Sequence, residues 1–249
     1  METVGTIWRR LFAALLVAGV ASPVALAADT YEAERQALLH EIEQDVRDTA
    51  QYLNRRALDE RVMRALATVP RHEFVPLDER RLAYENRPLP IGHGQTISQP
   101  YIVAIMTDLI EPGPGCRALE VGTGSGYQAA ILSELCHKVY TIEIIEALGT
   151  TARERLARLG YRNVTVRVGD GYYGWDEHAP FDVIVVTAVA SQVPPPLLRQ
   201  LKAGGRMILP IGTRFTAQEL ILVRKAEDGR VTTRQILPVR FVPLTGDHE

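Results

Sequence analysis

An acid and three alternating glycines stand out as residues that could bind a cofactor. The run Glu120 to Gly126 reads EVGTGSG and lies between a strand-like stretch at 117–121 and a helix-like stretch at 127–135. Glycine has no Cβ, so the backbone N–H groups of such a strand-to-helix turn can approach a ligand closely. The contacts predicted from this motif are Glu120, Gly122, Gly124 and Gly126.

The spacing of the glycines favours one class of cofactor. Dinucleotide sites usually carry GxGxxG, which rests a pyrophosphate on the helix N-terminus. GxGxG with an acid just upstream is instead typical of S-adenosyl-L-methionine sites, where a carboxylate suits the ammonium group of the methionine tail. The motif therefore predicts S-adenosyl-L-methionine as the cofactor, with a glycine turn that binds no ligand as the alternative.

Two further carboxylates stand at the ends of the next two strand-like runs. The run 139–142 ends at Glu143, in the place of an acid that accepts both ribose hydroxyls of a nucleoside. The run 163–168 leads into Asp170, which is flanked by glycines and can turn toward an adenine amino group. Taken singly, each acid is as readily a surface or capping residue. Because ligands of open α/β sheets bind outside the carboxyl ends of the strands, three acids at three successive strand ends favour a cofactor site.

The remaining pattern predicts one α/β domain with a doubly wound, mostly parallel sheet. The chain has 249 residues, 46% hydrophobic and 23% charged, which is enough for one sizeable core. Further elements are predicted as strands at 181–187, 205–211, 220–225 and 240–244, a short helix at 196–201 and a turn at 227–229. Apolar residues at helical spacing in 38–53 and 58–66 predict extra N-terminal helices, and the polar, glycine-rich stretch 88–100 predicts an active-site loop.

Charge and residue spacing argue against two other kinds of site. The formal charge is -2 and no basic stripe is present, so no nucleic-acid partner is expected. Amino-methylating DNA enzymes place a polar carbonyl before two prolines and an aromatic residue after them, whereas here Val193 and Leu197 flank the prolines. The six histidines show no HxH or HExxH spacing and two cysteines cannot form a four-ligand cage, so no metal site is predicted.

The N-terminus predicts a secretory signal peptide at residues 1–27. Arg9 and Arg10 precede a largely apolar stretch at 11–20, and positions 25–27 form an AxA cleavage site. A membrane-spanning helix needs about 20 consecutive apolar residues, and here serine and proline interrupt the apolar run before that length is reached. No stable membrane anchor is therefore expected. We expect export, to the periplasm, by the general secretory route or by the twin-arginine route that the Arg-Arg-Leu-Phe sequence resembles. The alternative is a cytoplasmic protein with an apolar N-terminal helix packed on its domain.

Seven longer runs carry a more specific pattern. They read VPRHEFVP at 69–76, LPIGHGQTISQPYIVAIMTDLI at 89–110, LEVGTGSGYQAAILSEL at 119–135, VRVGDGYYGW at 166–175, FDVIVVTA at 181–188, LKAGGRMILPIG at 201–212 and FVPLTG at 241–246. Together they resemble the protein-L-isoaspartate O-methyltransferases. The resemblance implies a seven-stranded sheet of the Rossmann-like methyltransferase type. It also implies methyl transfer from S-adenosyl-L-methionine to the free α-carboxylate of L-isoaspartyl residues in damaged proteins and peptides, whose esters cyclise to a succinimide that opens partly to aspartate.

By this resemblance Ser98 takes the position of the family's active-site serine. A carboxylate is already ionised at neutral pH, so methylation needs an oxygen placed in line with the sulfonium methyl, and a hydroxyl donor suffices. Taken alone, Ser98 also suits the cap of a helix starting near Pro100. The other positions implied to contact cofactor or substrate are Gln95, Thr96, Ile97, Ser125, Glu143, Ile144, Asp170, Gly171 and Thr245. One departure is the stretch 189–192, where the family commonly has a proline, so the resemblance is weaker in this substrate-side loop.

The sequence thus predicts an exported monomeric enzyme whose residues 28–249 form a single catalytic domain. The alternative is an exported module of the same fold that binds a nucleoside or damaged proteins with little turnover. Cys116 and Cys136 flank the starts of neighbouring predicted strands, so a disulfide between them and a pair of buried thiols both stay open.

Overall fold

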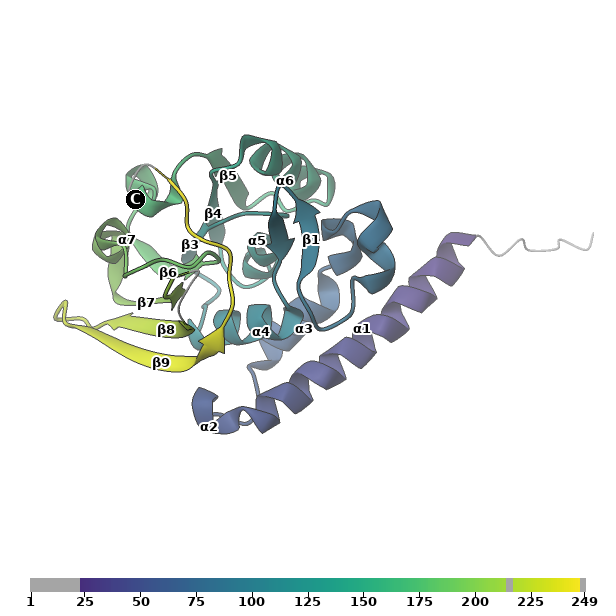
Figure 1. Cartoon of the computed structure of the whole chain (residues 1–249), viewed down its shortest axis with the longest axis horizontal. Helices are drawn as coiled ribbons and strands as arrows, with labels where there is room; N and C mark the ends of the chain where they lie inside the picture. The colour runs from purple at the N-terminus through teal and green to yellow at the C-terminus, as the bar shows by residue number, and fades with distance from the viewer. Residues whose placement is uncertain (1–22, 214–216, 247–249) are drawn as a thin grey trace, which may run out of the picture.

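The computed structural model describes residues 23–213 and 217–246, with side chains from residue 31 onward. At its centre lies a seven-stranded sheet in the order β5-β4-β3-β6-β7-β8-β9 (Figure 1). The strands are β3 (Arg117–Val121), β4 (Lys138–Glu143), β5 (Val164–Val168), β6 (Phe181–Val186), β7 (Leu201–Ile211), β8 (Gln218–Lys225) and β9 (Val231–Val239). The five strands from β5 to β7 pair in parallel, and β8 and β9 extend the sheet by antiparallel pairing. The predicted mostly parallel, doubly wound sheet is confirmed.

Helices cover both faces of this sheet. They are α1 (Pro23–Asp48), α2 (Ala50–Leu53), α3 (Glu60–Thr68), α4 (Pro100–Leu109), α5 (Tyr127–Ser133), α6 (Glu146–Arg158) and α7 (Pro195–Gln200). Successive side chains of a strand point to opposite faces. Accordingly Ala118 of β3 joins the core that includes α1, α3, α4 and α5, whereas Leu119 and Val121 join the core that includes Leu197 of α7.

The last strand differs from its sequence prediction. Residues 240–244 form no strand, and the sheet instead ends with β9, which pairs with β8 across the turn at 227–229. Thr232 and Thr233 are exposed on this edge strand. Because an edge strand needs little apolar surface, its sequence lacks the pattern that identifies the buried strands.

The segment after β9 returns across the ends of the parallel strands (yellow in Figure 1). Its backbone is held to the loop after β6: Val189 N–H donates to Val242 O at 2.8 Å, and Leu244 N–H donates to Val189 O at 2.9 Å. The predicted strand 240–244 is therefore wrong, but these residues take a place beside the strand ends, where ligands of such sheets bind.

The glycine-rich stretch 88–100 is more ordered than the predicted loop. It contains a two-stranded antiparallel hairpin of β1 (Leu89–Gly92) and β2 (Gln95–Ile97), followed directly by α4. A short 3-10 turn, η1 (Arg71–Phe74), precedes this region.

Cys116 and Cys136 form a disulfide, with their Cα atoms 4.7 Å apart. The bond joins the residue before β3 to the segment between α5 and β4, so α5 ends too early to carry Cys136 inside it. The sequence left open whether these cysteines form a disulfide or stay as buried thiols, and the structure contains the disulfide.

The N-terminal prediction falls mostly outside the described chain. Residues 1–22 of the predicted signal peptide lie there, and the described part begins with α1 at Pro23. Among the residues that the structure describes, no helix combines the length and hydropathy that a bilayer span requires.

Candidate active site

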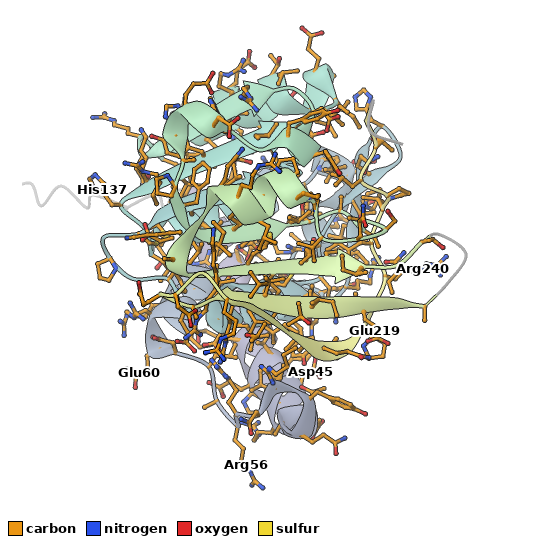
Figure 2. All side chains as sticks on the ribbon, turned by 90° about the vertical axis from the view of Figure 1, so that its left-hand side faces the viewer. Asp45, Arg56, Glu60, His137, Glu219 and Arg240 are labelled. Atoms are coloured by element: carbon orange, nitrogen blue, oxygen red, sulfur yellow. A yellow bond between two sulfur atoms is a disulfide. The ribbon has the colours of Figure 1, made fainter. Side chains whose placement is uncertain are left out.

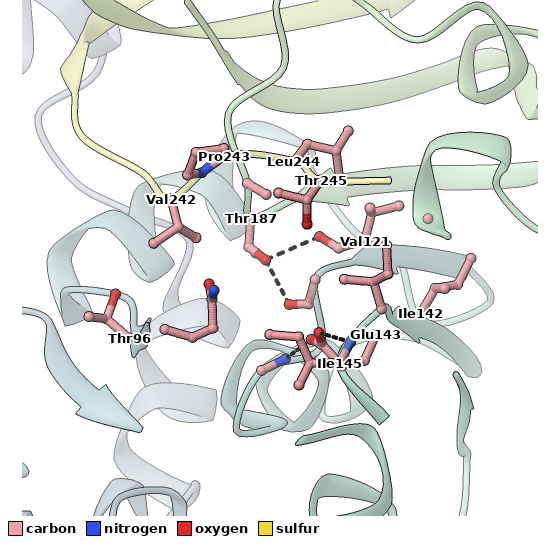
Figure 3. Close-up of a pocket in the computed structure, with 16 residues that line it drawn as sticks. Thr96, Val121, Ile142, Glu143, Ile145, Thr187, Val242, Pro243, Leu244 and Thr245 are labelled. Carbon is pink, nitrogen blue, oxygen red and sulfur yellow. Dashed lines mark hydrogen bonds between the residues drawn. The ribbon is translucent and has the colours of Figure 1, made fainter. Parts of the chain in front are cut away.

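One pocket opens at the carboxyl ends of β3, β4 and β6 (Figure 3). The chain order reverses on the two sides of β3, since β4 lies on one side and β6 on the other. Such a switch point is where open α/β sheets bind their ligands. Its lining residues are Gln95, Thr96, Val121, Gly122, Gly124, Ile142, Glu143, Ile144, Ile145, Gly171, Thr187, Ala188, Val242, Pro243, Leu244 and Thr245.

The glycine turn after β3 is shaped by close contacts that exclude a side chain. Gly122 has φ +95°, and a Cβ there would lie 2.4 Å from Oγ1 of Thr187. That hydroxyl donates to the carbonyl oxygens of Gly122 (2.7 Å) and Val121 (3.1 Å), as Figure 3 shows. Across the pocket, a Cβ on Gly171 would lie 2.4 Å from a methyl group of Val121. Glycine at these positions keeps backbone exposed to the pocket.

Glu143 joins the end of β4 to the glycine turn. Its side chain is 5% exposed, and its carboxylate accepts hydrogen bonds from Gly124 N–H at 2.7 Å and from Ile145 N–H at 2.9 Å. Each carboxylate oxygen can accept more than one hydrogen bond. Glu143 therefore has acceptor capacity left for the hydroxyl groups of a ligand in the pocket.

Glu120 occupies a different place from the predicted one. It alternates with Val121 along β3, so its side chain points away from the pocket and is fully buried. One carboxyl oxygen accepts from Oγ1 of Thr141 at 2.5 Å, and that hydroxyl lies 2.6 Å from Oγ1 of Thr123. Burial raises the pKa of Glu120 to about 8, and the nearby Glu143 adds to the rise. A neutral, enclosed carboxyl group provides no direct contact for an ammonium group, so the predicted contact is absent from this arrangement.

Four other predicted cofactor residues also lie outside the pocket lining: Ile97, Ser125, Gly126 and Asp170. Ile97 is 3% exposed and belongs to the core, because neighbouring β2 residues point to opposite sides. Gly126 is the N-cap of α5 and Ser125 precedes it, with its carbonyl accepting from Arg155 at 2.8 Å. Asp170 accepts from Tyr172 N–H at 2.9 Å and so caps a short 3-10 turn, η3 (Gly171–Tyr173), the capping alternative that the sequence left open.

A second cavity contains Ser98 and adjoins the first. Its lining residues are Pro88, Thr96, Ser98, Gln99, Ile102, Thr187, Pro238, Val239, Arg240, Phe241 and Val242. Thr96, Thr187 and Val242 line both cavities, so these three side chains stand at the boundary between them. A ligand in the first cavity and a ligand in the second would meet there.

Ser98 does not cap the following helix. The N-cap of α4 is Gln99, without a side-chain cap, so the capping interpretation of Ser98 is wrong. Within the described residues the Ser98 hydroxyl forms no hydrogen bond to protein, and only its backbone carbonyl is bonded. The hydroxyl is therefore available to a ligand of the second cavity.

Thr187 and Arg240 are site residues that sequence reasoning missed. Thr187 directly follows β6, although the sequence predicts it as the last residue of that strand, and the strand-end argument used for Glu143 applies to it equally. Arg240 is the one ionisable side chain among the lining residues of the Ser98 cavity. In Figure 2 it lies on the opposite side of the molecule from His137, which precedes β4 at the amino ends of the parallel strands.

The family follows from comparison with known proteins. A family model described as protein-L-isoaspartate(D-aspartate) O-methyltransferase matches residues 46–249. The chain belongs to this family. It is 64% identical over 234 residues to the protein-L-isoaspartate O-methyltransferase 2 of Syntrophobacter fumaroxidans, covering 94% of this chain and 95% of the relative. It is 65% identical over 209 residues to a Polaromonas enzyme of the same name, covering 84% of this chain and 99% of the relative.

Solved structures agree with the family. A protein-L-isoaspartate O-methyltransferase superposes with a TM-score of 0.74 at 30% identity, over 86% of this chain and 66% of that one. A putative protein-L-isoaspartate O-methyltransferase from Plasmodium falciparum, in complex with S-adenosyl-L-homocysteine, superposes with a TM-score of 0.70 at 26% identity, over 85% of this chain and 98% of that one. Family and fold, as the sequence predicted, are confirmed.

Proposed function

We propose that this chain transfers a methyl group from S-adenosyl-L-methionine to the free α-carboxylate of L-isoaspartyl residues in damaged proteins and peptides, and so initiates their repair. The observation that carries the proposal is the pair of adjoining cavities in a member of this family, one built on the glycine turn and Glu143 and the other containing Ser98. The cofactor supplies an electrophilic methyl group on a sulfonium. The protein has to place a carboxylate oxygen beside it.

The residues around the boundary suit that task. The substrate carboxylate needs no base because it is ionised at neutral pH. The Ser98 hydroxyl donates a hydrogen bond to one carboxylate oxygen and leaves the other directed toward the first cavity, past Thr96 and Thr187. Glu143 accepts ribose hydroxyls of the cofactor, and the exposed backbone at Gly122, Gly124 and Gly171 leaves room for it.

The test is formation of base-labile methyl ester from labelled S-adenosyl-L-methionine and an isoaspartyl peptide, with the matching aspartyl peptide as control. Ser98→Ala should lower turnover roughly tenfold to a hundredfold, because one charge-assisted hydrogen bond of about 1.5–3 kcal/mol is lost. Ser133→Ala, at the far end of α5, should retain turnover. Cofactor binding without ester formation would support the alternative of a binding module, and full activity of Ser98→Ala would remove the serine from the mechanism.

We further propose that residues 1–27 direct a monomeric enzyme to the periplasm and are then removed. The basic pair Arg9 and Arg10, the apolar stretch and the AxA site support this proposal. Replacement of both arginines by lysine keeps the positive charge that general secretion needs but removes the guanidinium pair of a twin-arginine signal. Efficient export and cleavage of the double lysine variant would exclude the twin-arginine route. Wild-type protein that stays uncleaved in the cytoplasm would exclude the signal peptide.

A further inference from the structure

Arg71, in the turn η1, is a fully buried arginine without an acidic partner. Its side chain is 0% exposed, and no carboxylate of the described residues lies within ion-pair distance of it. Burial lowers the pKa of its guanidinium to about 10, which leaves it charged at neutral pH. Burying an unpaired charge is costly, and filling space alone would favour an apolar side chain. A buried arginine at this position is therefore best explained by the hydrogen bonds that its guanidinium donates.

The guanidinium donates to carbonyl groups on both sides of the hairpin that lines the active site. Nε donates to Ala83 O at 2.8 Å, and Nη2 donates to Ser98 O at 2.8 Å and to Arg87 O at 3.5 Å. Between these carbonyls lies the β1–β2 hairpin, which carries Gln95 and Thr96. The Arg71 side chain thus links the two ends of segment 83–98 through hydrogen bonds to their backbone carbonyls.

The same guanidinium also contacts the helix that follows the glycine turn. Its Cζ atom lies 4.8 Å from the ring centroid of Tyr127, the first residue of α5. A planar cation over an aromatic ring is attracted by the ring face. Arg71 therefore connects the backbone of Ser98, in the second cavity, to the helix behind the turn that lines the first.

We propose that Arg71 is a positioning residue, whose guanidinium fixes the backbone of Ser98 relative to the cofactor turn so that the Ser98 hydroxyl meets the substrate carboxylate at the cavity boundary. The inference rests on the proposed function. The planar fork of an arginine presents its donors in fixed directions and can hold carbonyls from separate segments in one arrangement, whereas the rotatable donors of a lysine ammonium do not fix that geometry. A displacement of about 1 Å in a reacting group can cost on the order of a hundredfold in rate.

The test compares Arg71→Lys and Arg71→Gln with wild type in the methyl-ester assay. Turnover is expressed per site that binds S-adenosyl-L-homocysteine in calorimetry, so that misfolded protein does not lower kcat. We expect kcat to fall roughly tenfold to a hundredfold in both variants, with the cofactor Kd near the wild-type value. The cofactor Kd should change less than kcat because Glu143 and the glycine turn keep their own hydrogen bonds, and only Gln95 and Thr96 of the first cavity's lining are carried by the hairpin.

Arg35→Lys is the matched control. Arg35 is largely buried, donates to Ala67 O at 2.9 Å and packs its guanidinium 5.6 Å from the ring centroid of Tyr84, but it makes no contact with Ser98. The Arg35→Lys substitution should lower Tm and leave kcat unchanged. Wild-type kcat in either Arg71 variant, with only a lower Tm, would overturn the inference. So would a fall in kcat that Arg35→Lys reproduces. Absence of ester formation by the wild type would overturn the proposed function itself, and the inference with it.

Discussion

Of the three acids predicted to contact the cofactor, Glu143 is the one that lines the pocket. Its carboxylate also accepts a hydrogen bond from the glycine turn. Glu143→Gln should weaken cofactor binding by roughly tenfold to a hundredfold, because a charge-assisted hydrogen bond of about 1.5–3 kcal/mol is lost and the amide nitrogen cannot accept from one of the two backbone N–H groups. A ribose contact holds ground state and transition state alike, so kcat at saturating cofactor should change less. Calorimetry and steady-state kinetics measure the two quantities.

The control for this change is Glu146→Gln, which removes an exposed carboxylate at the start of α6 without altering the pocket. Its cofactor Kd should match that of the wild type. A loss of kcat with normal cofactor affinity in Glu143→Gln would contradict the ribose contact.

Arg240 gives the Ser98 cavity its positive charge. An isoaspartyl substrate is anionic, so Arg240→Ala should raise the KM for the peptide. The side chain is exposed, and an exposed ion pair contributes only about 1 kcal/mol, so the expected rise is roughly fivefold. The difference should shrink at high salt because exposed charges are screened.

The comparison for Arg240 is Arg230→Ala, which removes an exposed arginine from the β8–β9 turn. If both variants shift KM equally, the effect comes from overall charge and not from the cavity. A KM that does not respond to Arg240→Ala would remove this residue from substrate binding.

At the scale of elements, the disulfide encloses the part of the chain that forms the cofactor turn. Cys116 and Cys136 are 20 residues apart, and the loop between them contains β3, the glycine turn and α5. Closing a loop of this length should add about 3 kcal/mol to the free energy of unfolding, by restricting the unfolded chain. The double variant Cys116→Ser, Cys136→Ser should be less stable by that amount in urea unfolding.

Reductant provides the control for the disulfide. It should bring the wild type down to the stability of the double variant and leave the double variant unchanged. If the double variant were as stable as the oxidised wild type, the bond would contribute nothing to the stability of this unit.

At the scale of the whole molecule, the N-terminal helix is part of the packed structure. The ring of Tyr31 in α1 stacks on His72 with centroids 4.0 Å apart, and Nδ1 of His72 lies 2.8 Å from the hydroxyl of Tyr84. Leu38, Ile42 and Val46 of the same helix are buried in the core shared with α4. Tyr31 and the residues after it would remain in the protein after the proposed cleavage.

Global stability should depend on pH through Glu120. The pKa of this carboxyl is about 8 in the folded protein and has an ordinary value of 4.5, so between these values the folded state binds one more proton than the unfolded state. The free energy of unfolding should therefore fall as pH rises from about 5 to about 8, by up to about 1.4 kcal/mol per pH unit from this group. Urea unfolding across this range measures the slope.

Glu120→Gln isolates that contribution, because the amide stays neutral and can still accept from Thr141. Its stability should fall less steeply with pH than that of the wild type, while all other titrating groups are shared. Equal slopes for the two proteins would mean that Glu120 is already ionised at neutral pH.

The parallel part of the sheet and the position of the cofactor turn can be predicted from the sequence alone. Strand β6 is an almost continuous apolar run because both faces of the sheet are covered, and β3 and β4 are short, mostly buried runs of apolar and β-branched residues. Such runs can be recognised without any knowledge of their partners. The glycines after β3 can likewise be recognised in the sequence. The physical reason for Gly122 is that its backbone passes so close to Thr187 that a side chain has no room there.

Which side chains reach the ligand cavities depends on how the elements pack and cannot be predicted from the sequence. Glu120 and Val121 are neighbours in sequence, yet the pleat of β3 turns one into the core and the other into the pocket. Arg71 and Ser98 are 27 positions apart, and their hydrogen bond exists only because the fold brings η1 next to the residue that follows the hairpin. Apolar periodicity in the sequence indicates which face of an element is buried. Contacts between polar groups that are distant in sequence depend instead on how the folded elements pack against one another. A single sequence carries no periodic signal for such contacts.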